Sequence, residues 1–303
     1  AADGTIGIGV SSLAALTSGE ANIAIGYQAM LTHTTGNSNI AIGYQAMDDT
    51  DHHADTLAST DNIFIGRSAG GGTWSTNDCN YNVGIGNYVM DAAMNNCTLN
   101  TAVGHQALSG LTVNATRNTS LGYQALIQGS TGNDNTAVGA LAGVSITTGT
   151  NNTAIGAYAS GEGTVNAITG AHNTTVGYAA GYALEGVANN NVLLGSSTGD
   201  AMTTGTKNTV IGAYADTDDA TATNQIVIGY SEVGYADGFA SIGGTVLGLN
   251  VPNTMSSPYY RFDGANDEIA IADSAHLSFG DGVTDIPFSI SAWINMEDAT
   301  SFR

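Results

Sequence analysis

Positive charge is almost missing from this chain of 303 residues. It has 5 lysines and arginines against 26 aspartates and glutamates, and its formal net charge is −21. Nucleic-acid binding depends on Lys and Arg contacts that neutralise phosphates, so the composition predicts no nucleic-acid partner. An anionic membrane surface is disfavoured for the same reason. The acidity instead fits an extracellular protein.

Long apolar runs and proline are also scarce. No run approaches the roughly 20 apolar residues that a membrane-spanning helix needs, so no membrane insertion is expected. The three prolines, Pro252, Pro258 and Pro287, lie close to the C-terminus, as do most of the phenylalanines. This change of composition predicts a second domain there.

A short repeated motif dominates the rest of the chain. The stretch NIAIGYQAM occupies residues 22–30 and recurs unchanged at 39–47, and near-copies follow as far as QIVIGYSEV at Gln225. Each copy has one glycine at the same offset, here called the repeat glycine, with variable spacing between copies. A constant core with elastic spacing predicts a solenoid of about 13 coils over residues 1–243. The repeat glycines are Gly9, Gly26, Gly43, Gly66, Gly86, Gly104, Gly122, Gly139, Gly156, Gly177, Gly195, Gly212 and Gly229.

Each copy of the motif predicts one short strand of an all-β, parallel β-solenoid. The residue before the repeat glycine, position −1, is Ile, Val or Leu, and position −3 is Ile, Val or Thr, so these side chains share one strand face. Position −2 points the other way and is often small, as in Ala24 and Ala41. Both faces are therefore expected to be buried, which requires a lateral partner that three-fold association would supply.

Position −4 is Asn in eleven consecutive copies. When coils stack, these amides come into register and can form a hydrogen-bonded ladder. The alternative is that each Asn caps its own turn, and both roles are structural. The residues are Asn22, Asn39, Asn62, Asn82, Asn100, Asn118, Asn135, Asn152, Asn173, Asn191 and Asn208.

The chain has two cysteines, Cys79 and Cys97, and each lies seven residues before its repeat glycine. They therefore occupy the same place in adjacent coils, which stack about 4.8 Å apart. That spacing is inside the Cα range of a disulfide. Two alternatives follow: a Cys79–Cys97 disulfide in an oxidising compartment, or two reduced thiols in stacked loops.

Few residues suggest a chemical site. The acidic loop MDDTDHHADTLASTD contains the candidate metal ligands Asp48, Asp51, His52 and Asp55, but their spacing matches neither an EF-hand nor a zinc site. A solvated loop is the simpler interpretation, as it is for the run DTDDAT at 216–221. No catalytic triad, carboxylate cleft or nucleotide motif stands out. The chain is expected to be neither an enzyme nor dependent on a cofactor.

Tyrosine often follows the repeat glycine, and His105 stands in the same place in one copy. A packed aromatic ladder is favoured over a sugar-binding platform for this row. The tyrosines are Tyr27, Tyr44, Tyr123, Tyr178 and Tyr230.

The motif resembles two known families of surface fibres. The core N-[TI]-A-[IV]-G-x-x-A resembles the left-handed β-roll of trimeric autotransporter adhesin heads, and NIAIGYQAM and NTAVGHQAL resemble shaft repeats of phage tail-fibre proteins. The resemblance covers about residues 5–243 and implies a homotrimeric fibre for surface attachment. The repeat here is longer than in adhesin heads, except between Gly229 and Gly243.

The C-terminal residues follow a different pattern. Residues 244–258 are interpreted as a linker. The stretches YYRFDGANDEIAIADSAHLSF and FSISAWINM within 259–303 resemble the first strands of a laminin-G or concanavalin-like jelly roll. A partial β-sandwich is therefore expected, and such domains often bind glycans.

These features favour the structural shaft of a virus, a phage tail fibre or another virion appendage, that displays a host-attachment domain. The expected partners are further copies of the chain, other virion or surface proteins and host glycans, at an extracellular virion surface. The alternative is a trimeric adhesin head on a bacterial cell surface that binds matrix or glycans. A monomeric ice-binding solenoid ranks lower, because Thr101, Thr119, Thr136 and Thr153 share the aliphatic face that is expected to be buried. A glycan-degrading spike ranks lower still, for lack of a carboxylate cleft.

Overall fold

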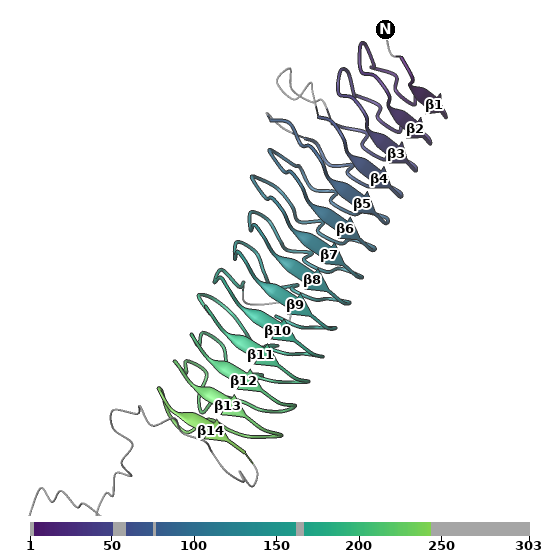
Figure 1. Cartoon of the computed structure of the whole chain (residues 1–303). Helices are drawn as coiled ribbons and strands as arrows, with labels where there is room; N and C mark the ends of the chain where they lie inside the picture. The colour runs from purple at the N-terminus through teal and green to yellow at the C-terminus, as the bar shows by residue number, and fades with distance from the viewer. Residues whose placement is uncertain (1–2, 51–58, 75–76, 162–166, 244–303) are drawn as a thin grey trace, which may run out of the picture. The chain divides into compact units, whose positions relative to one another are not determined.

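The computed structural model of the chain describes residues 3–50, 59–74, 77–161 and 167–243. Within these ranges it contains 14 short strands and no helix. All the strands form one parallel sheet whose spatial order is the chain order (Figure 1). The predicted all-β parallel β-solenoid of about 13 coils is confirmed. The strands are β1 Ile6–Ile8, β2 Ile23–Ile25, β3 Ile40–Ile42, β4 Ile63–Ile65, β5 Val83–Ile85, β6 Thr101–Val103, β7 Thr119–Leu121, β8 Thr136–Val138, β9 Thr153–Ile155, β10 Thr174–Val176, β11 Val192–Leu194, β12 Thr209–Ile211, β13 Ile226–Ile228 and β14 Ala240–Ile242.

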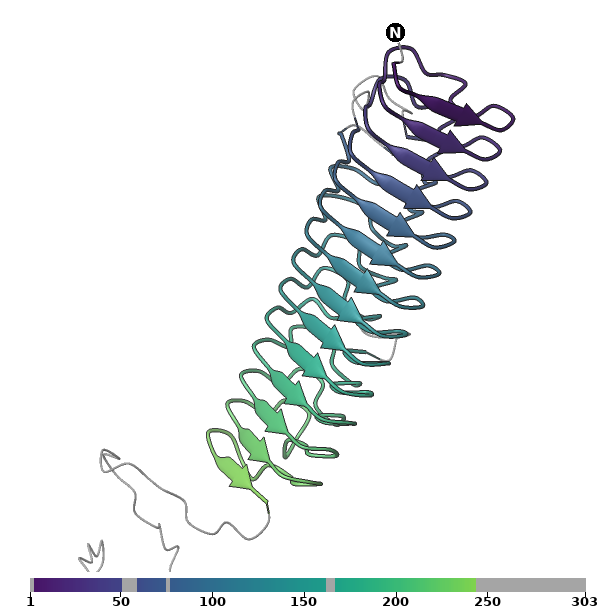
Figure 2. The ribbon, with the colours of Figure 1, turned by 45° about the vertical axis from the view of Figure 1, so that its right-hand side comes forward.

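The coils stack in an unshifted register. In β2 and β3, Ile23 pairs with Ile40 and Ala24 with Ala41, and the other strands repeat this arrangement. Figure 2 shows the strands stacked edge to edge along the solenoid, with the connecting loops on either side. At about 4.8 Å per strand, the stack of coils is roughly 60 Å long. The predicted linker 244–258 and the predicted sandwich strands in 259–303 lie outside the described residues.

The repeat glycine is required because the next coil lies directly against it. Gly122 has a φ of 142°, in a region that L residues rarely adopt. A Cβ on Gly122 would also lie 2.4 Å from the carbonyl oxygen of Gly139 in the following coil. The motif therefore keeps a glycine here for both conformation and stacking distance.

The core lies inside the coil and is made largely of small residues. The middle residue of each strand from β2 to β13 is buried, as is the alanine three residues after most repeat glycines. Larger side chains occur in the core where the neighbouring positions are occupied by glycine. Phe64 is fully buried beside Gly70 and Gly84, and a Cβ on Gly84 would lie 2.5 Å from its ring. Trp74 packs edge-on against Phe64, with ring centroids 5.9 Å apart.

Left-handed backbone conformations recur in every coil, and the sequence alone does not predict them. Non-glycine residues have φ near +55° at positions +2 and −5 and in many coils at +4, for example Gln45, Ser38 and Met47. Such conformations are uncommon for residues other than glycine. Here they turn the chain at fixed corners, and backbone hydrogen bonds to the adjacent coils hold them: Gln45 N–H donates to Tyr27 O at 2.9 Å.

Candidate functional site

The largest candidate site is the outer strand face, which we define as positions −3 and −1 of strands β2 to β13. Its side chains are half-buried or exposed in the single chain, and Leu121 is 47% exposed. No charged residue occurs at these positions. In the single chain the inner face is closed and the outer face is open, so burial of the outer face by a lateral partner stays a prediction.

This result also changes the argument about ice binding. The outer face contains a continuous row of threonines at position −3, from Thr101 in β6 to Thr174 in β10. Thr101 and Thr119 are exposed in the single chain, so the low rank of ice binding depends on a partner that covers this face. The first coils differ, because β2 and β3 carry isoleucine at both outer positions.

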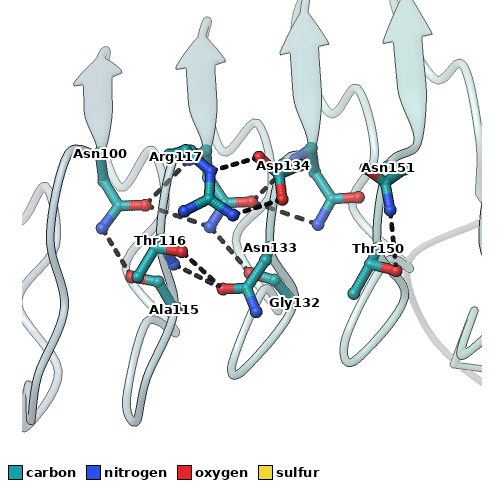
Figure 3. Close-up of polar contacts among 11 residues, drawn as sticks. Asn100, Ala115, Thr116, Arg117, Gly132, Asn133, Asp134, Thr150 and Asn151 are labelled. Carbon is teal, nitrogen blue, oxygen red and sulfur yellow. Dashed lines mark hydrogen bonds and ion pairs between the residues drawn. The ribbon is translucent and has the colours of Figure 1, made fainter.

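The asparagine ladder predicted from position −4 runs through the core (Figure 3). Asn118 donates to Asn100 Oδ1 twice, from its backbone N–H at 3.0 Å and from Nδ2 at 3.1 Å. Its Nδ2 also donates to Gly132 O in the following coil, at 2.8 Å. The same set of bonds links the other asparagines of this position, from Asn22 to Asn208. The ladder alternative is confirmed, and its buried, satisfied amides have a structural role.

Polar pairs continue the ladder onto the surface. Arg117 and Asp134 form a two-point ion pair, with Nε to Oδ1 at 2.6 Å, and Thr116 N–H donates to the side chain of Asn133 (Figure 3). Arg117 lowers the pKa of Asp134 through this hydrogen bond. Arg117 is exposed and the Asp134 side chain is 35% exposed, so the pair contributes little to stability.

The two cysteines come together as their spacing predicts. Cys79 and Cys97 are buried, and Cys97 N–H donates to Cys79 Sγ at 3.4 Å. The structure holds them as free thiols. The thiol of Cys97 also donates to Thr112 O at 3.2 Å. The choice between a disulfide and two thiols stays a prediction.

Aromatic side chains form a row along one corner of coils two to seven. Tyr27 and Tyr44 are stacked, with centroids 5.2 Å apart and planes 14° apart. His105 and Tyr123 are stacked similarly at 5.6 Å. Because stacked rings cover each other's faces, this arrangement favours a packed ladder over a sugar platform. Between the two stacks, Arg67 lies over the rings of Tyr44 and Tyr88, and Tyr88 meets His105 edge-on.

The candidate metal loop is only partly described. Asp51, His52 and Asp55 lie outside the described residues. Burial raises the pKa of Asp48 to about 6. Among the residues that the structure does describe, no three His, Cys, Asp or Glu side chains gather in a way that could hold a metal ion.

The acidic pair Asp200 and Asp216 has no signal in the sequence beyond the charge run 216–221, which contains only Asp216. Asp216 lies against Asp200 of the preceding coil and accepts hydrogen bonds from the backbone of Ala201 and Thr217, both at 2.9 Å. Burial, together with the hydrogen bond to Asp200, raises the pKa of Asp216 to about 6. Asp216 is thus not simply solvated, although the run 216–221 was interpreted that way.

In the described part of the chain there is no helix that could cross a bilayer. Comparisons of the chain with protein families, with curated proteins and with solved structures found no match.

Proposed function

We propose that the chain is the shaft of a homotrimeric fibre on a virus particle, which displays a host-attachment or glycan-binding domain. The observation that carries this proposal is the outer strand face, an uncharged surface that follows the whole length of a regular solenoid. Its role is mechanical: stacked coils hold the attachment domain away from the particle. Three identical domains on one shaft would then gain avidity by multivalency.

Size and charge both support self-association through this face. A surface about 60 Å long and 10 Å wide covers roughly 600 Å² before side-chain relief. That is near the largest apolar patch of ordinary monomers and of the order that one partner contributes to a standard interface. Copies with a net charge of −21 repel each other over most of their surface. An acid-free face is where they can meet at least electrostatic cost.

Native mass by light scattering tests the trimer. We expect three times the 30.6 kDa mass of the chain. The variant Leu121→Glu with Leu194→Glu puts two charges on the outer strand face and should give monomers with an unchanged far-UV spectrum. The matched control, Val187→Glu with Val233→Glu, adds the same charge at exposed apolar residues outside the strands and should stay trimeric.

A monomeric wild type would overturn the trimer. It would also make ice binding through the open Thr and Ile rows the better candidate, which a thermal-hysteresis measurement tests. The bacterial adhesin head shares the trimeric shaft but would bind matrix or glycans through the solenoid itself. Sequencing the flanking genes separates the two: capsid or tail genes favour the virus, and a membrane anchor in the same reading frame favours the adhesin.

A further inference from the structure

Cys79 and Cys97 occupy equivalent places in adjacent coils, seven residues before Gly86 and Gly104. Both side chains are fully buried. The backbone N–H of Cys97 donates to Cys79 Sγ at 3.4 Å, so the sulfur of one residue lies against the backbone of the other.

Hydrogen bonds join the two coils on both sides of the pair. Before it, Asn77 Nδ2 donates to Asn95 Oδ1 at 2.8 Å. After it, Leu99 N–H donates to Asn80 O at 3.1 Å. These bonds keep the two coils at strand spacing, about 4.8 Å, which lies inside the Cα range that a disulfide spans.

Packing of the coils does not require a cysteine seven residues before the repeat glycine. The equivalent position in the other coils holds only Gly, Ala or Ser, and Ser59 in the preceding coil accepts from Cys79 N–H at 3.0 Å, as Cys79 does from Cys97. Cysteine therefore appears in two neighbouring coils where smaller residues suffice. The equivalent residues are Gly19, Gly36, Ser59, Ala115, Gly132, Gly149, Gly170, Ala188, Gly205 and Ala222.

We propose that Cys79 and Cys97 form a disulfide that cross-links the coils of β5 and β6. The oxidant is a small disulfide such as oxidised glutathione. During folding, one cysteine thiolate attacks one sulfur of it, forms a mixed disulfide and releases one small thiolate. The other cysteine then loses its proton and attacks the protein sulfur of the mixed disulfide, which releases the second small thiolate. Two protein thiols are oxidised and one small disulfide is reduced to two thiols.

The thiolate is the nucleophile in disulfide exchange, and a buried thiol is inert. Because both thiols are buried in the folded chain, the exchange takes place during folding, before the coils close over the pair. A solenoid is held together by contacts between neighbouring coils. A cross-link between two central coils therefore limits how far unfolding spreads along the shaft.

The experiment uses the full chain, refolded from denaturant in oxidised glutathione and then unfolded in iodoacetamide without reductant. We expect an intact mass lower by two hydrogens than the reduced chain, with no alkylated cysteine. Thermal unfolding of this form should shift down by several degrees on adding reductant. Two alkylated cysteines, or glutathione left on either one, would overturn the proposal.

Two variants keep the test independent of folding failure. Cys79→Ala with Cys97→Ala places at both sites a residue that other coils already use, and its melting should be insensitive to reductant. Cys79→Ala with Ala115→Cys moves the pair one coil along, so that Cys97 faces residue 115. This variant should oxidise as the wild type does. A moved pair that stays reduced, while the wild type oxidises, would overturn the argument that coil stacking sets the geometry.

Discussion

The two sides of each strand come from adjacent residues of the same three-residue segment, yet their side chains differ in burial and in what constrains them. In β9, Ala154 is fully buried inside the coil, while Ile155 beside it is 39% exposed on the outer strand face. The inner side is fixed by the coil itself, because its neighbours are other parts of the same turn. The outer side is constrained only by what packs on it from outside.

Residue choice along the solenoid reflects this difference. Inner residues change in compensation with one another: Leu193 replaces the usual alanine where Gly181 and Gly199 leave room, and a Cβ on either glycine would lie 2.9 Å from its side chain. Outer residues exchange Ile, Val, Leu and Thr with no partner residue in the coil. The inner side therefore specifies the fold, and the outer side is free to specify an assembly.

The most severe test places the same charge on the two sides of one strand. Ala154→Asp buries an unpaired carboxylate and should lower the free energy of unfolding by about 4 kcal/mol or more. Ile155→Asp leaves its charge at the surface and should cost about 1 kcal/mol in the single chain. Urea denaturation at low protein concentration measures both. Equal losses for the two variants would contradict the division into inner and outer sides.

Two glycine variants, with a smaller expected loss of stability, separate the contribution of coil stacking from that of backbone conformation. Gly122 and Gly238 both have positive φ, but a Cβ on Gly238 has no neighbour within 4 Å. Gly238→Ala should therefore cost about 1 kcal/mol, the penalty of a left-handed L residue. Gly122→Ala adds a collision with Gly139 and should cost about 3 kcal/mol. The difference in urea midpoint between the variants isolates the contribution of stacking, and a Gly238 variant as unstable as the Gly122 variant would argue against it.

The periodicity of the sequence was sufficient to predict the sheet, its direction and the asparagine ladder. The copies share a glycine at one offset, Asn at −4 in eleven of them, and side chains that alternate over −3, −2 and −1. This pattern predicts parallel stacking of the coils, whatever residues the loops contain. It was not sufficient to decide which apolar face is open. Ile23 and Ala24 are both apolar, and only the course of the returning loop determines which one points inward.

Other features were hidden because they depend on contacts between distant loops or on unusual backbone. The pairing of Asp200 with Asp216 joins two loops of different sequence, so no repeat marks it. Left-handed corners occur at Gln45 and Met47, which have no preference for that conformation. The cysteine pair is the exception: both residues fall at one offset from their repeat glycines, and that shared offset located it.

The smallest expected effect concerns two acids that are half-buried in the solenoid. Asp48 and Asp216 have pKa values raised to about 6, in both cases chiefly by burial. The folded chain therefore binds more protons than the unfolded chain between about pH 4 and 6. Stability should be lowest above pH 6 and should increase as the pH falls through 6 towards 4. Because both groups are partly exposed, we expect less than about 1 kcal/mol from each between pH 7.5 and 5, measured by urea denaturation.

A pair of charge-matched variants assigns this pH dependence to the buried carboxylates rather than to net charge. Asp200→Asn removes the carboxylate that Asp216 faces, so the pKa of Asp216 should fall and the chain should lose part of its gain in stability at pH 5. Glu20→Gln removes one charge from an exposed residue and should leave that gain unchanged. If both variants reduce the gain equally, repulsion among the many surface acids explains the pH dependence, and the half-buried acids behave no differently from the exposed ones.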